Sequence, residues 1–279
     1  MFLKQVGIGW VKDVEIISSR QNSLLKERCK LHQKKFREKT GLFLIEGIRL
    51  VEEAVRASCL EEVFVEETLF SSERGQELFR QIEKGSFRHF QIKREILKAL
   101  AETESPQGIV GVARQEKFSL TDLKIKKGLI LILDGLQDPG NLGTIWRTAW
   151  AAGVDALFCL AGTVEPYNSK TIRATMGGVF HVPVVTGVDW LSLRRWCKQE
   201  RFQFVAGDLQ AEQSHFAVKY PERVALLIGN EARGFLTIKP EDAEVRVKIP
   251  LRNEAESLNA AVACGILTYE IIRQRTLFS

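Results

Sequence analysis

The arrangement of hydrophobic and polar residues predicts a chain that alternates between strands and helices. In the second half, the runs LILILDGL, ALFCLA, FQFVAGDL and RVALLIGNE are rich in branched apolar residues, which is typical of strands buried on both faces. Apolar residues at helical spacing predict helices over residues 141–152, 168–175, 189–200 and 258–274. This order of elements predicts a mostly parallel sheet with helices on both faces.

A second, smaller α/β pattern occupies the start of the chain. The segment NSLLKERCKLHQKKF predicts a basic amphipathic helix, with Asn22 or Ser23 as its cap. The apolar strand GLFLIEG follows, and helical and strand patterns then alternate as far as QGIVGVA. These segments predict a compact α/β domain that precedes the larger one.

A polar stretch separates the two patterns. RQEKFSLTDLKIKKG has few apolar residues and is interpreted as a linker. The length of 279 residues is sufficient for about two domains. We therefore predict an N-terminal domain at residues 1–115, a linker at 116–127 and a C-terminal domain at 128–279.

Composition excludes several classes of protein. No apolar run approaches the roughly 20 residues that a membrane helix needs, and charged residues interrupt the start of the chain, unlike a secretory signal. The five cysteines are scattered and form no CxxC pair, which argues against a zinc site or a disulfide framework. We expect a protein of the reducing cytoplasm that binds no metal.

Positive charge is concentrated at the start of the chain. The formal net charge is +5, and residues 1–40 alone contain ten Lys and Arg against four Asp and Glu. Such an excess indicates a polyanionic partner for the N-terminal domain. A solvated basic helix face would give the same composition, and charge alone does not separate the two interpretations.

The first of three polar loops in the C-terminal domain has the sequence DGLQDPGNLGTIWRTA. It leaves a buried strand at Asp134 and enters a helix near Asn141, which is a candidate helix cap. Arg147 lies within two turns of that helix start, between Trp146 and Trp150. A guanidinium is always charged and needs partners when buried. Arg147 is therefore either an exposed or ion-paired surface residue or a ligand for an anion such as phosphate, and its large apolar neighbours favour the anion ligand.

Two further loops carry polar residues at strand ends. The sequence GNEARG, residues 229–234, follows the strand VALLI, and its two glycines suit a backbone that closely approaches another group. The sequence IPLRNEAESLNAAVA follows a short strand that ends at Ile249. Ser257 is expected to cap the last helix, and Asn259 lies in its first turn, where free amides can hold polar atoms of a ligand.

The common nucleotide and hydrolase signatures are missing from the chain. It contains no GxGxxG, GxxxxGK[ST], HExxH or GxSxG sequence. A dehydrogenase or another nucleotide enzyme on a doubly wound sheet is the structural alternative, and the missing glycine fingerprint disfavours it.

Together, the three loops resemble the three motifs of the SpoU/TrmH family of RNA ribose methyltransferases, in the knotted SPOUT class. NLGTIWRTA resembles motif one, GNEARG resembles motif two, and IPLRNEAESLNAAVA resembles motif three. VEPYNSKTIRATMGGVFHVPV resembles the stretch between motifs one and two, and SSRQNSLLKERCKLHQKKFREKTGLFLIEGIRLVEEA resembles the substrate-binding domain of many members. Ala232 and Arg252-Asn253 fall where members vary.

The resemblance implies a fold and an activity. The C-terminal domain would be a parallel-sheet SPOUT domain with a deep trefoil knot, and the N-terminal domain a smaller α/β substrate-binding domain. The protein would be a homodimeric enzyme that uses S-adenosylmethionine to methylate a ribose 2′-hydroxyl in structured RNA, most readily 23S rRNA. A tRNA ribose methyltransferase, an antibiotic-resistance rRNA methyltransferase and a non-catalytic RNA-binding protein on the same scaffold are the alternatives.

The resemblance also assigns roles to individual residues. The catalytic residues would be Arg147, Asn141, Glu231, Ser257 and Asn259, with Arg147 serving a site shared across the dimer interface. The cofactor would be held by Gly229, Ile249, Leu258, Asn230 and Leu227. The RNA backbone would be contacted by basic residues of the N-terminal domain, namely Arg20, Lys30, Lys34, Lys35 and Arg37.

Overall fold

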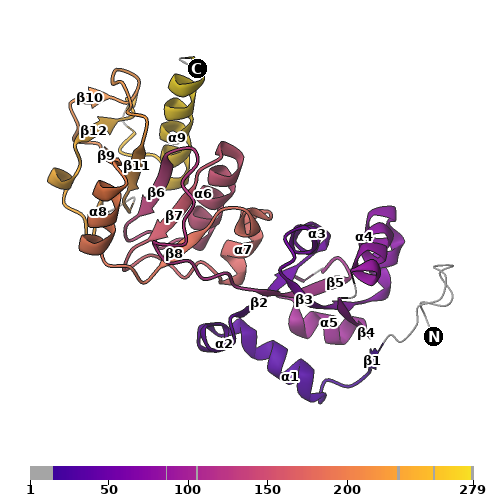
Figure 1. Ribbon diagram of the computed structural model, residues 1–279. Coiled ribbons are helices and arrows are strands. Elements are labelled where there is room, and N and C mark those ends of the chain that lie inside the picture. The colour runs from indigo at the N-terminus through magenta and orange to yellow at the C-terminus, as the bar shows by residue number, and fades with distance from the viewer. Residues whose placement is uncertain (1–14, 86, 105, 231–232, 254, 278–279) are drawn as a thin grey trace. The chain divides into compact units, whose positions relative to one another are not determined.

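Two compact units make up the protein, whose computed structural model is drawn in Figure 1. The structure describes residues 15–85, 87–104, 106–230, 233–253 and 255–277. The N-terminal unit comprises Met1–Glu116 and Tyr167–Phe180, and the C-terminal unit comprises Lys117–Pro166 and His181–Ser279. These units are groupings by contact, so the linker and domain boundaries expected from the sequence stay a prediction.

The N-terminal unit is built on a five-stranded mixed sheet. Its strands are β1 (Glu15–Ile17), β2 (Leu42–Glu46), β3 (Leu60–Val65), β4 (Arg88–Ile92) and β5 (Ile109–Arg114). Its helices are α1 (Ser23–Cys29), α2 (Lys34–Thr40), α3 (Ile48–Arg56), α4 (Glu73–Lys84), α5 (Arg94–Leu100) and α7 (Ser169–Thr175). The strand order is β1-β4-β3-β5-β2, and β5 is antiparallel to both of its neighbours.

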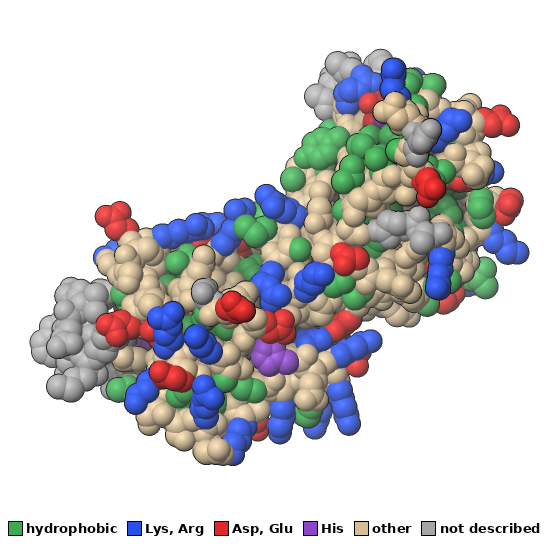
Figure 2. All heavy atoms as spheres, turned by 180° about the vertical axis from the view of Figure 1, so that it is seen from behind, with side chains coloured by type: hydrophobic (Ala, Val, Ile, Leu, Met, Phe, Trp, Pro, Cys, Tyr) green, Lys and Arg blue, Asp and Glu red, His purple; other side chains and the backbone are tan. Residues whose placement is uncertain are grey.

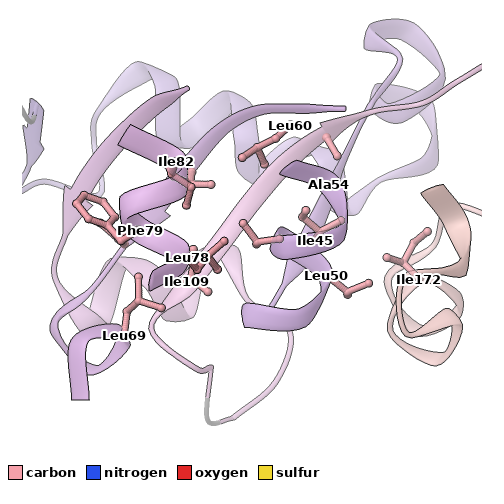
Figure 3. Close-up of a cluster of buried hydrophobic side chains, with 14 of the residues drawn as sticks. Ile45, Leu50, Ala54, Leu60, Leu69, Leu78, Phe79, Ile82, Ile109 and Ile172 are labelled. Carbon is pink, nitrogen blue, oxygen red and sulfur yellow. The ribbon is translucent and has the colours of Figure 1, made fainter. Parts of the chain in front are cut away.

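Hydrophobic side chains cover both faces of this sheet. On one face, Leu50 of α3 and Phe79 of α4 pack in the cluster drawn in Figure 3. Ile172 of α7 packs into the same cluster, so this segment of the later sequence belongs to the N-terminal unit. On the other face, Leu25 of α1 and Leu97 of α5 form a second cluster with the strands. Helix α1 is therefore part of the core and cannot be removed without exposing apolar surface.

The C-terminal unit is built on a seven-stranded parallel sheet, as the sequence predicts. Its strands are β6 (Leu129–Leu133), β7 (Ala156–Cys159), β8 (Val184–Thr186), β9 (Gln203–Gly207), β10 (Gln213–Ser214), β11 (Val224–Ile228) and β12 (Val245–Lys248). Its α-helices are α6 (Pro139–Ala152), α8 (Trp190–Gln199) and α9 (Ala260–Leu277). The order is β10-β12-β9-β11-β6-β7-β8, and each of these strand pairs is parallel.

The parallel sheet separates two layers of helices, as expected. Leu193 and Cys197 of α8 pack against Ile132 and Phe158 on one face. Helices α6 and α9 contact each other on the opposite face, and α9 also contacts β9 and β11 (Figure 1). This arrangement puts the two helices that follow the first and third polar loops side by side. No helix in the described part of the chain is long and apolar enough to cross a membrane.

The basic helix expected near the start of the chain is broken in the structure. Helix α1 ends at Cys29, a 3-10 turn covers Lys30–His32, and α2 begins at Lys34. Asn22 caps α1, as one of the two expected alternatives, by accepting a hydrogen bond of 2.9 Å from the amide of Leu24. The break falls at Gln33, whose backbone is extended, with φ −95° and ψ 130°. Nη1 of Arg37 folds back and donates to the carbonyls of residues 31 and 32, which precede the break.

The two helices that follow polar loops begin at different residues from those expected. Helix α6 begins at Pro139, and the side chain of Asp138 caps it by accepting a hydrogen bond of 2.7 Å from the amide of Asn141. Asn141 is therefore not the cap. Helix α9 begins at Ala260, and the side chain of Asn259 caps it by accepting a hydrogen bond of 2.9 Å from the amide of Ala261. The prediction of a Ser257 cap is wrong, because the helix starts at residue 260, two residues later than expected.

Candidate active site

A hollow of about 420 Å³ opens at the carboxyl-terminal edge of the parallel sheet. Residues of three segments line it, within 207–210, 228–240 and 247–267. These segments follow the ends of β9, β11 and β12, where open α/β sheets bind their ligands. The volume is also within the usual range for small-molecule sites. The hollow is therefore the candidate cofactor site of the C-terminal unit.

The loop after β11 folds back tightly and forms one wall of the hollow. The amide of Asn230 donates to the carbonyl of Gly234 over 2.8 Å, and the amide of Gly234 donates back over 3.0 Å. A Cβ on Gly229 would lie 2.7 Å from the carbonyl carbon and oxygen of Gly234. Only glycine fits there without a shift of the loop backbone. Glu231 and Ala232 lie outside the described residues, so the role of Glu231 stays a prediction.

Asp134 connects the first polar loop to the second. Its buried Oδ2 accepts hydrogen bonds of 2.7 to 2.9 Å from the backbone amides of residues 236–238. The side-chain amide of Asn230 donates to the carbonyl of Gly135 over 3.2 Å. These contacts hold the chain after GNEARG against the end of β6. The sequence indicates only that Asp134 ends a strand. Nothing in the sequence predicts that three backbone amides donate to one oxygen of its carboxylate.

The third loop supplies the opposite wall. Ile249 and Leu258 line the hollow together with Gly229, so three of the five residues expected to hold the cofactor converge on one space from distant loops. Ser257 is exposed and also lines the hollow. Residues 207–210 after β9 line it as well, and the sequence analysis did not single them out. A usable signal existed, because parallel strands end at the same edge of a sheet.

A side-chain contact joins the first and third loops. The amide nitrogen Nδ2 of Asn259 donates to Oδ1 of Asn141 over 2.8 Å. The same Asn259 caps α9 through its own Oδ1. Two of the predicted catalytic residues are thus in direct contact at the start of the helix that borders the hollow.

Arg147 is exposed on α6, about 1.7 turns beyond Asn141. Helix α6 packs on α9, and the side chain of Thr148 comes within 3.9 Å of a Cβ built on Gly265. Arg147 therefore lies on the same face of the sheet as α9, whose first turns line the hollow. Within the described part of the chain, no carboxylate or carbonyl pairs with its guanidinium. Of the two interpretations of the sequence, the exposed position is the observed one, and an unpaired guanidinium remains able to bind an anion.

Leu227 is the predicted cofactor residue that the structure places elsewhere. Its side chain is fully buried in β11 and packs in the cluster under α8, on the face of the sheet opposite α6 and α9. It is not among the residues that line the hollow. The physical reason is the two-residue period of a strand, which turns Leu227 away from the face to which Ile228 points.

The hollow fits the chemistry of S-adenosylmethionine. Gly229, Asn230 and Gly234 of the turn after β11 line it together with apolar residues such as Ile249, Leu251 and Leu258. A nucleoside needs both kinds of contact, since its base and ribose edges hydrogen-bond and its ring faces are apolar. The absence of a Cβ at Gly229 lets the backbone approach a ligand closely.

The buried cysteines are unsuited to nucleophilic catalysis. All five cysteines are free. Burial raises the pKa of Cys159, which ends β7, and of Cys264, inside α9, to about 12 in each case. A thiol that stays protonated at neutral pH is a poor nucleophile. Among the described residues, no group of three His, Cys, Asp or Glu side chains is arranged to hold a metal ion.

Four of the five predicted RNA-binding residues are exposed in the N-terminal unit. Lys34 and Lys35 are exposed at the start of α2, and Nζ of Lys30 lies 5.5 Å from the centroid of the Phe36 ring. Arg20 is exposed and donates to the carbonyl of Glu95. Figure 2 shows many Lys and Arg side chains on the molecular surface.

Arg37, the fifth residue predicted to bind RNA, does not share this exposed position. Its side chain is buried, with 6% of the residue exposed, and it donates to the carbonyls of Leu31 and His32 over 2.7 and 2.8 Å. Its charge therefore serves the turn between α1 and α2, and we do not retain it among the RNA-binding residues.

Comparison with known families gives two matches that together cover most of the chain. The profile of the SpoU rRNA Methylase family matches residues 128–269, and that of the MRM3-like substrate binding domain matches residues 22–111. Both matches fall in segments for which the sequence motifs predict those two roles.

Individual relatives extend over nearly the whole chain. The 23S rRNA (guanosine(2553)-2′-O)-methyltransferase RlmP of Bacillus subtilis (strain 168) is 37% identical over 262 residues, with coverage of 91% of this chain and 98% of the relative. The human mitochondrial rRNA methyltransferase 3 is 29% identical, with coverage of 86% and 69%. The crystal structure of an AdoMet-bound rRNA methyltransferase from Sinorhizobium meliloti superposes with a TM-score of 0.82 at 30% identity, over 93% of this chain and 98% of that one.

Proposed function

The chain belongs to the SpoU rRNA methylase family, and we propose that it transfers a methyl group from S-adenosylmethionine to a ribose 2′-hydroxyl of 23S rRNA. The observation that carries the proposal is the convergence of Gly229, Ile249 and Leu258, from loops distant in the sequence, on one hollow. The substrate class follows from the relatives, whose names specify 2′-O-methylation of guanosine in 23S rRNA.

The reaction is an in-line displacement that leaves little covalent chemistry to the protein. Bound S-adenosylmethionine supplies an electrophilic methyl carbon and its own neutral leaving group. The 2′-oxygen forms the new C–O bond as the C–S bond breaks, and the hydroxyl proton is released. Positioning of the two reactants is therefore the main task of the chain's own residues.

We assign Arg147 the task of holding a phosphate of the RNA next to the reacting ribose. A guanidinium stays protonated and is therefore a poor base, but it is a strong ligand for phosphate and stabilises developing negative charge. Arg147 is exposed and has no ionic partner among the described residues, which supports this role. We expect Arg147 to increase the rate by stabilising the negative charge that develops at the 2′-oxygen.

The remaining predicted residues position the reactants. Gly229, Asn230, Ile249 and Leu258 hold the cofactor along the walls of the hollow. The hydrogen bond between Asn141 and Asn259 keeps the start of α6 against the start of α9, so that Arg147 is held relative to the cofactor. Ser257 and Glu231 complete the set as residues that orient the nucleotide, the roles that the motifs assign to them.

We further propose that the enzyme is a homodimer, with the trefoil knot of its class, and that it acts in the cytoplasm. Helix α9 supports the dimer, because apolar side chains occur on all sides of it and Val262 and Tyr269 are 51% and 49% exposed. A helix that is apolar all round is normally buried. Val262, Ile266 and Tyr269 share one stripe by helical spacing, which a second copy would cover.

The experiment that tests the proposed function uses purified protein, S-adenosylmethionine with a labelled methyl group, and unmodified 23S rRNA transcript. We expect the label to be incorporated into 23S rRNA and one phosphodiester bond to become resistant to alkali, since a 2′-O-methyl group blocks cleavage there. Unmodified tRNA transcripts are the control. Label in tRNA alone would select the tRNA alternative, and cofactor binding without transfer to either RNA would select the non-catalytic one.

Lys34 and Lys35 are expected to contribute phosphate contacts from the N-terminal unit. In the Lys34→Ala/Lys35→Ala double variant, we predict weaker binding of 23S rRNA and a slope of log K against log salt that is smaller by about 1.5, because each phosphate contact contributes roughly 0.7 to 0.9. Filter binding between 50 and 300 mM KCl measures this slope. Point variants are used because α1 and its neighbours carry core residues such as Leu25.

The matched control for this prediction is the double variant Lys93→Ala/Lys98→Ala at α5. These lysines are also exposed and belong to the same unit, so they report the effect of lost charge alone. An equal decrease of the slope in both double variants would contradict a specific contact at α2.

A further inference from the structure

A stacked pair of aromatic side chains lies one turn along α6 from Arg147. The indole of Trp150 and the imidazole of His181 are parallel, with an interplanar angle of 1° and 4.2 Å between ring centroids. His181 is exposed and Trp150 is partly exposed. The proposed methyl transfer assigns no role to either ring.

The stack is held in place by the structure around it. The indole N–H of Trp146, a fully buried side chain, donates to the carbonyl of Val182 over 3.0 Å. The amide of Leu157 in β7 donates to the carbonyl of Pro183 over 2.9 Å. The chain next to His181 is thus attached both to α6 and to the sheet, so the backbone that carries the imidazole is restrained beside Trp150.

Arg147 and Trp150 are neighbours on the surface of α6. Residues three positions apart on a helix have Cβ atoms about 5 to 6 Å apart. The surface therefore combines a preformed aromatic pair with a guanidinium that no described residue pairs with. Proteins that bind single-stranded or unstacked RNA combine these two features, since phosphate binds the charge and a base stacks on the ring.

We propose that the Trp150–His181 stack binds a nucleobase of the RNA substrate, either that of the methylated nucleotide or that of its neighbour. This inference rests on the proposed function, because it takes the RNA to be bound at Arg147. A ribose must leave the base stack for its 2′-hydroxyl to reach the cofactor, and unstacking costs a few kcal/mol. Stacking on the aromatic pair offsets that cost, at about 1 to 3 kcal/mol per base.

The test compares Trp150→Ala and Trp150→Phe with the wild-type protein. For Trp150→Ala, we expect a KM for 23S rRNA and a filter-binding Kd that are about 5- to 150-fold higher, an unchanged Kd for S-adenosylmethionine, and a smaller change in kcat. Trp150→Phe retains an aromatic ring and should recover most of the affinity. Leu191→Ala on α8 removes another exposed apolar side chain, with 67% of the residue exposed, and serves as the control with no expected effect.

A second measurement identifies the base. Once the methylated nucleotide is mapped, transcripts with an abasic site at that nucleotide or at either neighbour are bound to both proteins. We expect one abasic site to weaken binding to the wild-type protein and to have no further effect on Trp150→Ala. Equal effects of every abasic site in both proteins would overturn the proposal, as would wild-type RNA affinity in Trp150→Ala.

Sedimentation separates RNA stacking from a contact between subunits. If Trp150→Ala changes the oligomeric state in the absence of RNA, the stack is a subunit contact and the proposal is wrong. Failure of the proposed function is distinguishable, because wild-type protein would then transfer no methyl group to 23S rRNA, whereas the filter-binding comparison does not depend on methyl transfer.

Discussion

Replacement of Arg147 by alanine is expected to remove nearly all methyl transfer while S-adenosylmethionine still binds with near-normal affinity. The guanidinium is exposed, and no partner among the described residues depends on it for folding, so the variant should remain stable. Arg147 is also not among the residues that line the cofactor hollow. The loss should therefore appear in kcat and in kcat/KM for RNA, and calorimetry with S-adenosylmethionine should be unaffected.

The expected decrease in kcat is about 10²- to 10³-fold, the usual effect of removing one preorganised donor that stabilises charge in the transition state. Arg147→Lys keeps the charge but not the planar fork of donors, and should recover part of the rate. Arg195→Ala is the matched control, since Arg195 is also exposed but lies on α8, which covers the other face of the sheet. Near-normal turnover by Arg147→Ala would remove this residue from the mechanism.

The architecture of the C-terminal unit could be predicted from the sequence because its strands are buried on both faces. Runs such as LILIL in β6 and VALLI in β11 permit few other interpretations. The elements that were missed, β1, β8 and β10, have three, three and two residues. Segments so short contain no measurable period, and their strand geometry comes from pairing with neighbours.

Helix starts were harder to predict, although one signal was available. Asp138 precedes Pro139, and a capping residue followed by proline at the first helical position is a recognised start. The prediction of Asn141 as the cap missed this pair. At α9, Ser257 and Asn259 are both good caps, and sequence alone could not choose between them.

Long-range contacts of the site were outside the reach of the sequence. From the sequence, only the resemblance predicts that Gly229, Ile249 and Leu258 lie together. The structure gives the physical reason, because all three belong to loops that follow parallel strands and line one hollow. Arg37 illustrates the opposite case. Composition counts it as surface charge, but its guanidinium binds two carbonyls of the preceding turn, a contact that depends on where α1 ends.

Substitution of Gly229 by alanine is expected to abolish S-adenosylmethionine binding, and with it all methyl transfer. The new Cβ would lie 2.7 Å from the carbonyl carbon and oxygen of Gly234 and 3.0 Å from the amide nitrogen of Phe235. These are backbone atoms, and Asp134 holds the adjoining residues through three amide hydrogen bonds. The turn must shift as a whole, which changes the wall of the hollow. We expect the Kd for the cofactor to increase by at least about 100-fold, or more than about 2.7 kcal/mol, by calorimetry.

Gly207→Ala and Gly265→Ala calibrate this result. A Cβ on Gly207, which also lines the hollow, would lie 2.8 Å from the tip of the flexible Leu267 side chain, so a smaller increase in Kd is expected. A Cβ on Gly265 in α9 would lie 3.9 Å from Thr148, and alanine there should leave the Kd unchanged and stabilise the helix slightly. Thermal unfolding of all three variants checks that Gly229→Ala remains folded. Equal cofactor affinity in Gly229→Ala and Gly265→Ala would mean that the turn after β11 is not part of the cofactor site, because the clash with Gly234 cannot be relieved without moving that turn.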